Sequence, residues 1–241
     1  MASGLQFNSH ATNQDVVSEI NATCNSDNNS YPLVDKARRT NLALDRFFTL
    51  AFRANGQWTY DDTNYNTDPI QTINLVSGTQ SYDLGTFTSE ILGILRVEAL
   101  NSSSGDSIVL YRLDRSSMGD TALTEYQTTN GIPQEYDLVG ETIYLYPAPS
   151  YSATNGLRIY LERNKSALVS TDTTKVLPVP SLFNRYICNL TSLPWLIENQ
   201  KPQKNDIAAL IAQDEVKINE YFANREKGIP RRMSMNLRNW R

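Results

Sequence analysis

The apolar residues of this chain change their spacing twice along its 241 residues. In residues 31–56 and again in residues 181–228 they recur every three or four positions, which predicts amphipathic helices. Between these regions, and most clearly at Ile91–Leu100, short apolar runs alternate with clusters of turn residues, which predicts strands. The sequence therefore predicts an α+β fold, in which N- and C-terminal helices form a helical bundle with an inserted antiparallel β domain.

The same change of spacing divides the chain into expected segments. We expect an N-terminal arm and helices in residues 1–57, the β insertion domain in 58–175, C-terminal helices that pack on the N-terminal helices in 176–228, and a basic tail in 229–241. We expect residues 1–12 to form a loose arm. Pro194 lies within the later helical region, and we expect it to kink or split that helix.

The chain has few of the side chains on which catalysis and metal binding depend. His10 is its only histidine, which excludes Ser-His-Asp and Cys-His catalysis and most histidine metal sites. Two adjacent acidic pairs, Asp61–Asp62 and Asp214–Glu215, remain as acid-base candidates. Neighbouring residues point in different directions, so neither pair forms an obvious catalytic dyad. We therefore expect no enzyme, no cofactor and no metal.

The N-terminus has neither the basic start nor the apolar core of a secretory signal. We therefore expect Cys24 and Cys188 to be free thiols in a reducing compartment. No apolar run approaches the roughly 20 residues that cross a bilayer, and we expect no membrane contact.

Positive charge is concentrated at the C-terminus. Residues 225–241 hold six basic residues against Glu226, a net charge of +5, which leaves −9 on the remainder of a chain whose net charge is −4. Arg and Trp are favoured at interface hot spots, so this tail is a candidate docking segment. Its candidate residues are Arg225, Lys227, Arg231, Arg232, Arg238, Trp240 and Arg241. A solvated terminal tail is the alternative interpretation.

One segment of the β region has a recognisable pattern. The segment reads GIPQEYDLVGETIYLYPAPS and runs from Gly131 to Ser150. It resembles a pattern of the head-to-tail connector proteins, the portal-proximal adaptors, of tailed bacteriophages. The matching residues of this structural motif are Gly131, Pro133, Tyr136, Gly140, Ile143, Leu145, Pro147 and Pro149. The order of helix, β region, motif and closing helices is also similar, and the resemblance covers most of residues 31–226.

The resemblance implies a structural protein of the virion neck, made in the host cytoplasm. Such an adaptor binds beneath the portal protein as a ring, usually of twelve copies. The ring extends the DNA channel, through which genomic DNA passes without sequence-specific binding, and it provides a docking surface for a tail or nozzle protein. In such adaptors the C-terminal segment often reaches into the portal, which would give the basic tail its partner.

Two other functions remain open from the sequence. A carbohydrate-binding or carbohydrate-cleaving virion module would use a β surface rich in Tyr and Asn, but it would not need the last helix and its basic tail. A tail-tube or capsid-decoration protein would share the β part without needing helices at both ends.

Overall fold

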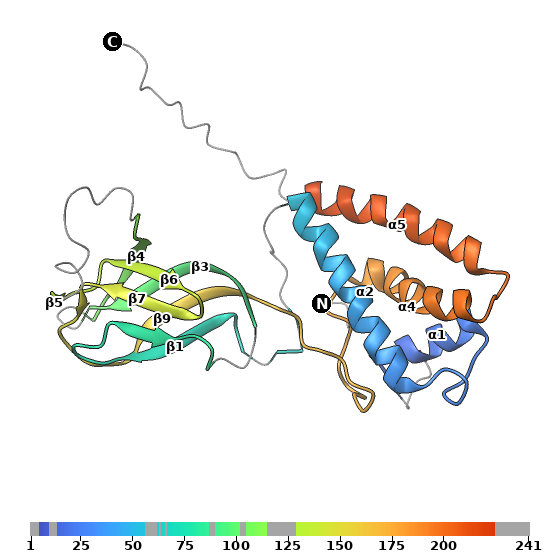
Figure 1. Ribbon diagram of the computed structural model, residues 1–241, viewed down its shortest axis with the longest axis horizontal. Coiled ribbons are helices and arrows are strands. Elements are labelled where there is room, and N and C mark those ends of the chain that lie inside the picture. Colours follow the sequence, from blue (N-terminus) through green and yellow to red (C-terminus); the bar gives the residue numbers. More distant parts are fainter. Residues whose placement is uncertain are drawn as a thin grey trace, which may run out of the picture. The chain divides into compact units, whose positions relative to one another are not determined.

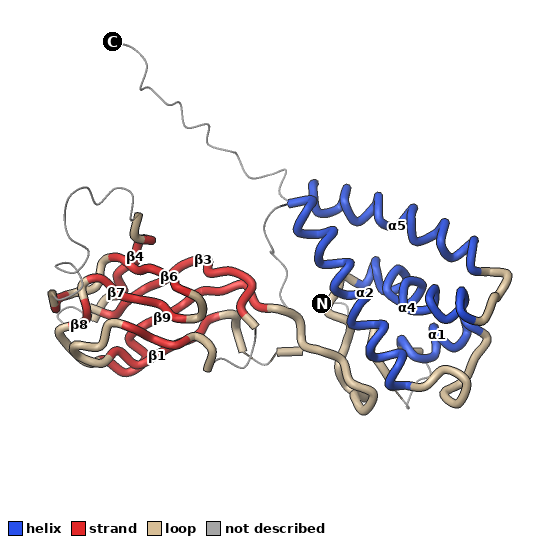
Figure 2. Tube along the Cα trace, in the orientation of Figure 1, coloured by secondary structure: helices blue, strands red, loops and turns tan. Residues whose placement is uncertain are grey.

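The chain divides into two compact units, which differ in secondary structure. A computed structural model describes residues 5–9, 14–55, 62, 64–65, 67–86, 90–101, 105–114 and 129–224. The first unit contains residues 1–60 and 167–241, and the second contains residues 61–166. The labelled helices belong to the first unit and the labelled strands to the second (Figures 1 and 2). The predicted α+β class is confirmed.

The first unit is built from four α-helices and one 3-10 turn in the described residues. They are α1 (Val16–Cys24), α2 (Leu33–Asn55), η1 (Ser181–Phe183), α4 (Asn184–Glu198) and α5 (Lys204–Asn224). Asp15 caps α1, because its carboxylate accepts the Ser18 amide at 2.6 Å. Asn25 ends α1 in the left-handed conformation, with φ 49°.

An aromatic cluster joins helices from the two ends of the chain. Phe47 on α2 lies at its centre, with ring centroids 5.5 Å from Phe183, 6.3 Å from Tyr186 and 5.8 Å from Phe222. Each buried aromatic pair adds about 0.5–1.5 kcal/mol beyond its area of burial. α2 packs against both α4 and α5, and α1 packs against α4, so one apolar core includes all four helices.

The N-terminal segment is anchored, and the prediction of a loose arm is wrong for residues 5–9. Phe7 is fully buried, and its amide donates to the Lys175 carbonyl at 2.8 Å. The buried carboxylate of Asp15 accepts the Ser9 amide at 2.6 Å as well as capping α1. The Phe7–Lys175 bond joins residues far apart in the sequence. A short polar segment has no apolar period from which such a contact could be predicted.

Of the kink or split expected at Pro194, the split does not occur, because α4 continues from Asn184 through Pro194 to Glu198. A proline removes one intrahelical donor, but packing on other helices can hold the helix together. Two of the residues around it, Trp195 and Leu196, are buried in the core of the first unit.

The second unit is a mainly antiparallel β structure. Its strands are β1 (Ile70–Leu75), β2 (Ser81–Asp83), β3 (Ile91–Leu100), β4 (Ser107–Arg112), β5 (Asn130–Gly131), β6 (Glu135–Val139), β7 (Thr142–Tyr146), β8 (Ala148–Pro149) and β9 (Ala153–Arg163). Seven of them form one sheet in the order β1-β9-β3-β4-β6-β7-β2, and β5 pairs with β8. The pairs β4–β6 and β5–β8 are parallel, so the sheet is not wholly antiparallel as the sequence predicted.

A buried carboxylate contributes to holding the two ends of the second unit together. Oδ2 of the buried Asp62 accepts both the amide and the hydroxyl of Ser166 at 2.7 Å, and Oδ1 accepts the Asn64 amide at 2.8 Å. In the first unit, the Asn41 side chain on α2 exchanges two hydrogen bonds with the Leu168 backbone, at 2.8 and 3.0 Å. Each unit thus has side-chain hydrogen bonds of its own close to the point where the chain returns from the second unit to the first.

The hairpin of β6 and β7 reverses at Gly140 and Glu141. Val139 pairs with Thr142, which leaves a two-residue loop, and Gly140 has φ 61°. A positive φ at the first loop residue alone is typical of a type II′ turn, which favours glycine there. An added Cβ at Gly140 would contact nothing within 4 Å, so any cost of substitution comes from the backbone and not from a clash.

We expect Gly140→Val to destabilise the β unit by about 1–2 kcal/mol, because a β-branched residue resists a positive φ. Gly140→Asn is the matched control, since Asn tolerates this conformation better. Urea unfolding of both variants measures the difference. Equal midpoints for the Val and Asn variants would show that the turn does not depend on the glycine.

Candidate functional site

The residues predicted to dock on a partner lie outside the described part of the chain. They are Arg225, Lys227, Arg231, Arg232, Arg238, Trp240 and Arg241. The helix α5, which precedes them, ends at Asn224. The tail therefore follows directly from the helical unit.

The first and last motif residues, Gly131 and Pro149, lie opposite each other in the short parallel strand pair of β5 and β8. Gly131 pairs with Pro149, and the Ser150 amide donates to the Gly131 carbonyl at 2.8 Å. An added Cβ at Gly131 would lie 3.0 Å from Cγ of Pro147, so this position has little room for a larger residue. The Gly78 amide also donates to the Pro149 carbonyl at 2.7 Å. The motif thus fixes the β1–β2 turn against the β5–β8 pair.

The other motif residues form the frame of the same region. Pro133 is buried, and Tyr136 on β6 pairs with Leu145 on β7. The Tyr136 carbonyl accepts the Leu113 amide at 2.7 Å, which continues the pairing of β6 with β4. The contacts described for these motif residues are strand pairings and backbone hydrogen bonds within the second unit.

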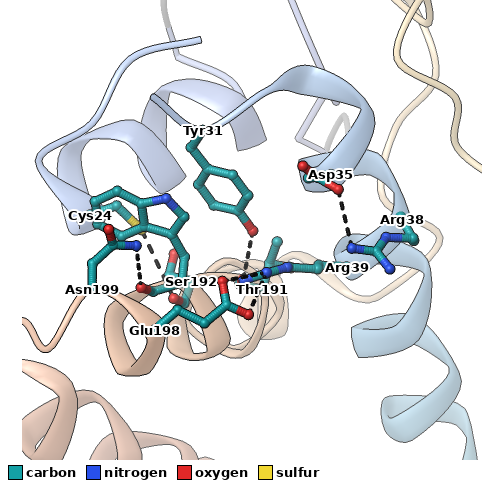
Figure 3. Close-up of polar contacts among 10 residues, drawn as sticks. Cys24, Tyr31, Asp35, Arg38, Arg39, Thr191, Ser192, Glu198 and Asn199 are labelled. Carbon is teal, nitrogen blue, oxygen red and sulfur yellow. Dashed lines mark hydrogen bonds and ion pairs between the residues drawn. The ribbon is translucent and has the colours of Figure 1, made fainter. Parts of the chain in front are cut away.

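The described polar residues of the helical unit include a cluster between α2 and α4 (Figure 3). The Tyr31 ring stacks on Trp195 at a centroid distance of 5.8 Å, and its hydroxyl donates to the Thr191 carbonyl at 3.1 Å. The Arg39 guanidinium lies 5.4 Å from the centre of the Tyr31 ring and binds both carboxylate oxygens of Glu198 at 2.8 Å. The Arg39 side chain is only 14% exposed.

Lys36 is the most unusual member of this region, because it is fully buried. Its ammonium group donates to Oδ1 of Asn21 at 2.6 Å and to Oδ1 of Asn28 at 2.8 Å. It also lies 5.1 Å from the centre of the Tyr31 ring. Burial lowers the pKa of Lys36 to about 8. The lysine therefore joins α1, the loop after it and α2 through neutral amide oxygens.

Several of the described carboxylates have structural partners, including three members of the two acidic pairs that were acid-base candidates. Glu215 binds Arg46 at 2.7 Å and accepts the Tyr186 hydroxyl at 3.2 Å, while Asp214 binds Lys217 at 2.8 Å. Asp62 is held by Ser166, as described above, and Asp61 lies outside the described residues. Cys24 and Cys188 are buried free thiols, as expected, and burial raises the pKa of each.

A cavity of about 410 Å³ lies at one end of the β unit. Its lining includes Leu84, Ile91, Ile94 and Leu138, with the carboxylates Glu90 and Glu141. Among the described residues, this lining combines an apolar surface with negative charge and contains no histidine, cysteine or serine. Among the described residues there is no cluster of three or more potential metal ligands. No helix in the same residues is long and apolar enough to span a membrane.

The buried lysine makes the stability of the helical unit depend on pH. The folded-state pKa of about 8 is below the unfolded value of 10.5, so the unfolded chain binds more protons between these values. Stability contributed by this group therefore increases as the pH rises from 8 towards 10.5. We expect the difference in free energy of unfolding between the native protein and Lys36→Met to increase over this range. Chemical denaturation at several pH values measures it, and a constant difference would contradict the pKa shift.

Comparison with known proteins places this fold in a family. No curated protein matches the chain. A family model described as SU10 adaptor protein matches residues 12–190, which run from just before α1 into α4 and include the whole β unit. The match covers well over half of the 241 residues. This chain belongs to the SU10 adaptor protein family, and it is a phage adaptor protein.

Proposed function

We propose that this adaptor is a structural protein of the virion neck, a head-to-tail connector that assembles as a ring of twelve copies beneath the portal. The ring extends the DNA channel and offers a docking surface to the tail or nozzle protein. In each copy, a helical bundle carries the inserted β domain. The observation that carries the proposal is the family match over residues 12–190.

The uneven charge of the chain supports this assignment of surfaces. A net charge of +5 in residues 225–241 suits contact with an acidic partner surface, and −9 on the remainder suits a channel wall that repels DNA and lets it slide. Because α5 ends at Asn224, the basic tail begins one residue beyond a rigid helix. The tail is thus suited to reach from the helical bundle into the portal.

We expect deletion of residues 229–241 to abolish binding to the cognate portal protein while the remainder stays folded. A milder variant replaces Arg231, Arg232, Arg238 and Arg241 with Gln. At roughly 0.5 kcal/mol for each exposed contact, it should lose about 2 kcal/mol, or roughly thirtyfold in affinity. Binding is measured by interferometry on immobilised portal, and folding by circular dichroism.

A charge change elsewhere serves as the control. Arg158→Gln removes an exposed positive charge from β9 and should leave portal affinity unchanged. Normal portal binding by the truncated protein would refute the role of the tail. Failure of the intact protein to form a ring with portal, as seen by electron microscopy, would refute the proposed function as a whole.

A further inference from the structure

Two helices of the first unit each have one face in the core and the opposite face exposed. On α2 the exposed face carries Val34, Arg38, Leu42, Asp45, Thr49 and Arg53, spaced three or four residues apart, and we name it the α2 stripe. Val34 is 66% exposed and Leu42 is 62% exposed. Apolar side chains exposed to this degree along one helix face mark it as a candidate contact surface.

The helix α5 has a corresponding face, the α5 stripe, which consists of Asp206, Ala209, Gln213, Val216 and Glu220. Val216 at its centre is 57% exposed. The stripe has three uncharged residues, Ala209, Gln213 and Val216, in the middle and an acidic residue at each end. The α2 stripe likewise carries Arg38 and Arg53 towards its two ends.

The charges on the two stripes are opposite in sign and similar in separation. Arg38 and Arg53 are 15 residues apart, and Asp206 and Glu220 are 14 residues apart. At 1.5 Å per residue, these spacings correspond to about 22 and about 21 Å along the helix axes. If the helices run antiparallel, the stripes align as Arg38 with Glu220, Leu42 with Val216, Asp45 with Gln213, Thr49 with Ala209, and Arg53 with Asp206.

Several of these charges are available for a new partner. Within the part of the chain that the structure describes, Arg53, Asp206 and Glu220 form no ion pair. Arg38 contacts Asp35 in an exposed pair at 3.1 Å, which is the kind of contact that contributes little. An intermolecular ion pair could therefore replace it at little cost.

The two stripes of one chain cannot meet each other. α2 and α5 already pack together through their opposite faces, where Phe47 and Phe222 lie 5.8 Å apart. Contacts between identical stripes are also disfavoured, because either orientation places Arg against Arg on α2 or acid against acid on α5. The charge pattern thus favours contact between the α2 stripe of one copy and the α5 stripe of another.

We propose that the α2 stripe of each copy packs antiparallel against the α5 stripe of the next copy, through the Leu42–Val216 contact and the flanking Arg38–Glu220 and Arg53–Asp206 pairs. This is a heterologous contact, the type that closes into a ring when its rotation permits. The inference rests on the proposed ring and identifies the surfaces that hold neighbouring copies together.

Cross-linking tests the pairing directly in the full-length protein. Chains with Leu42→Cys and chains with Val216→Cys are mixed, assembled on the cognate portal and treated with a short bismaleimide. Cys24 and Cys188 are buried at 0% and 3% exposure, so the introduced thiols are the accessible ones among the described residues. We expect a cross-linked dimer in the mixture and far less in either variant alone. A chain with both substitutions should give a ladder of higher oligomers.

A position of similar exposure in the other unit provides the matched control. Val139 is 50% exposed, and Val139→Cys mixed with Leu42→Cys should give at most a tenth of the dimer. Charge reversal gives a second readout: Arg38→Glu should weaken ring assembly, and Arg38→Glu combined with Glu220→Arg in the same chain should restore it.

The outcomes separate this inference from the proposed function. A ring on the portal without the 42–216 cross-link overturns the stripe pairing and leaves the proposed function standing. A cross-link at these positions without any ring supports the pairing and overturns the proposed function. Failure to obtain either overturns both.

Discussion

The packing of α2 against α4 and α5 is the constraint on which the rest of this structure depends. These helices come from opposite ends of the chain, and Phe47 contacts aromatic rings that are more than 130 residues away in sequence. Neither end has enough apolar surface to form a core alone. The intervening residues must therefore leave the helical unit and return to it. The β unit meets this requirement because its first and last described residues, Asp62 and Ser166, are hydrogen-bonded to each other.

Polar groups give this apolar packing its specificity. Tyr31, Lys36 and Arg39 lie close together along the start of α2, yet they reach different elements. Tyr31 and Arg39 bond to α4, and Lys36 bonds to α1 and to the loop after it. A buried ammonium held only by amide oxygens does not maximise stability, because burial favours its neutral form. Such groups penalise alternative packings in which their hydrogen bonds would be lost. The outer faces of α2 and α5 remain available, which is where the proposed contacts between copies lie.

The sequence predicted the structural features that depend on the local spacing of apolar residues or on a turn residue. The spacing of apolar residues predicted the α+β class, and Gly140 marked the hairpin between β6 and β7 because only the backbone matters there. Prediction from the sequence failed where long-range contacts decide the result. Residues 5–9, expected to belong to a loose arm, are held by backbone bonds to a distant segment. Lys36 could not be distinguished from a surface lysine, since its partners Asn21 and Asn28 carry no signal by themselves.

The hydrogen bonds between Asp62 and Ser166 have a consequence for chain entropy. Joining the ends of a flexible loop of roughly 100 residues costs about 4 kcal/mol, and a helical unit that had to close such a loop would bear this cost. Here the β unit brings its own ends together, so the helices meet a preformed connection that behaves as a very short loop. Closure of the β unit therefore depends on contacts inside residues 61–166, which include the Asp62–Ser166 bonds and the pairing of β1 with β9.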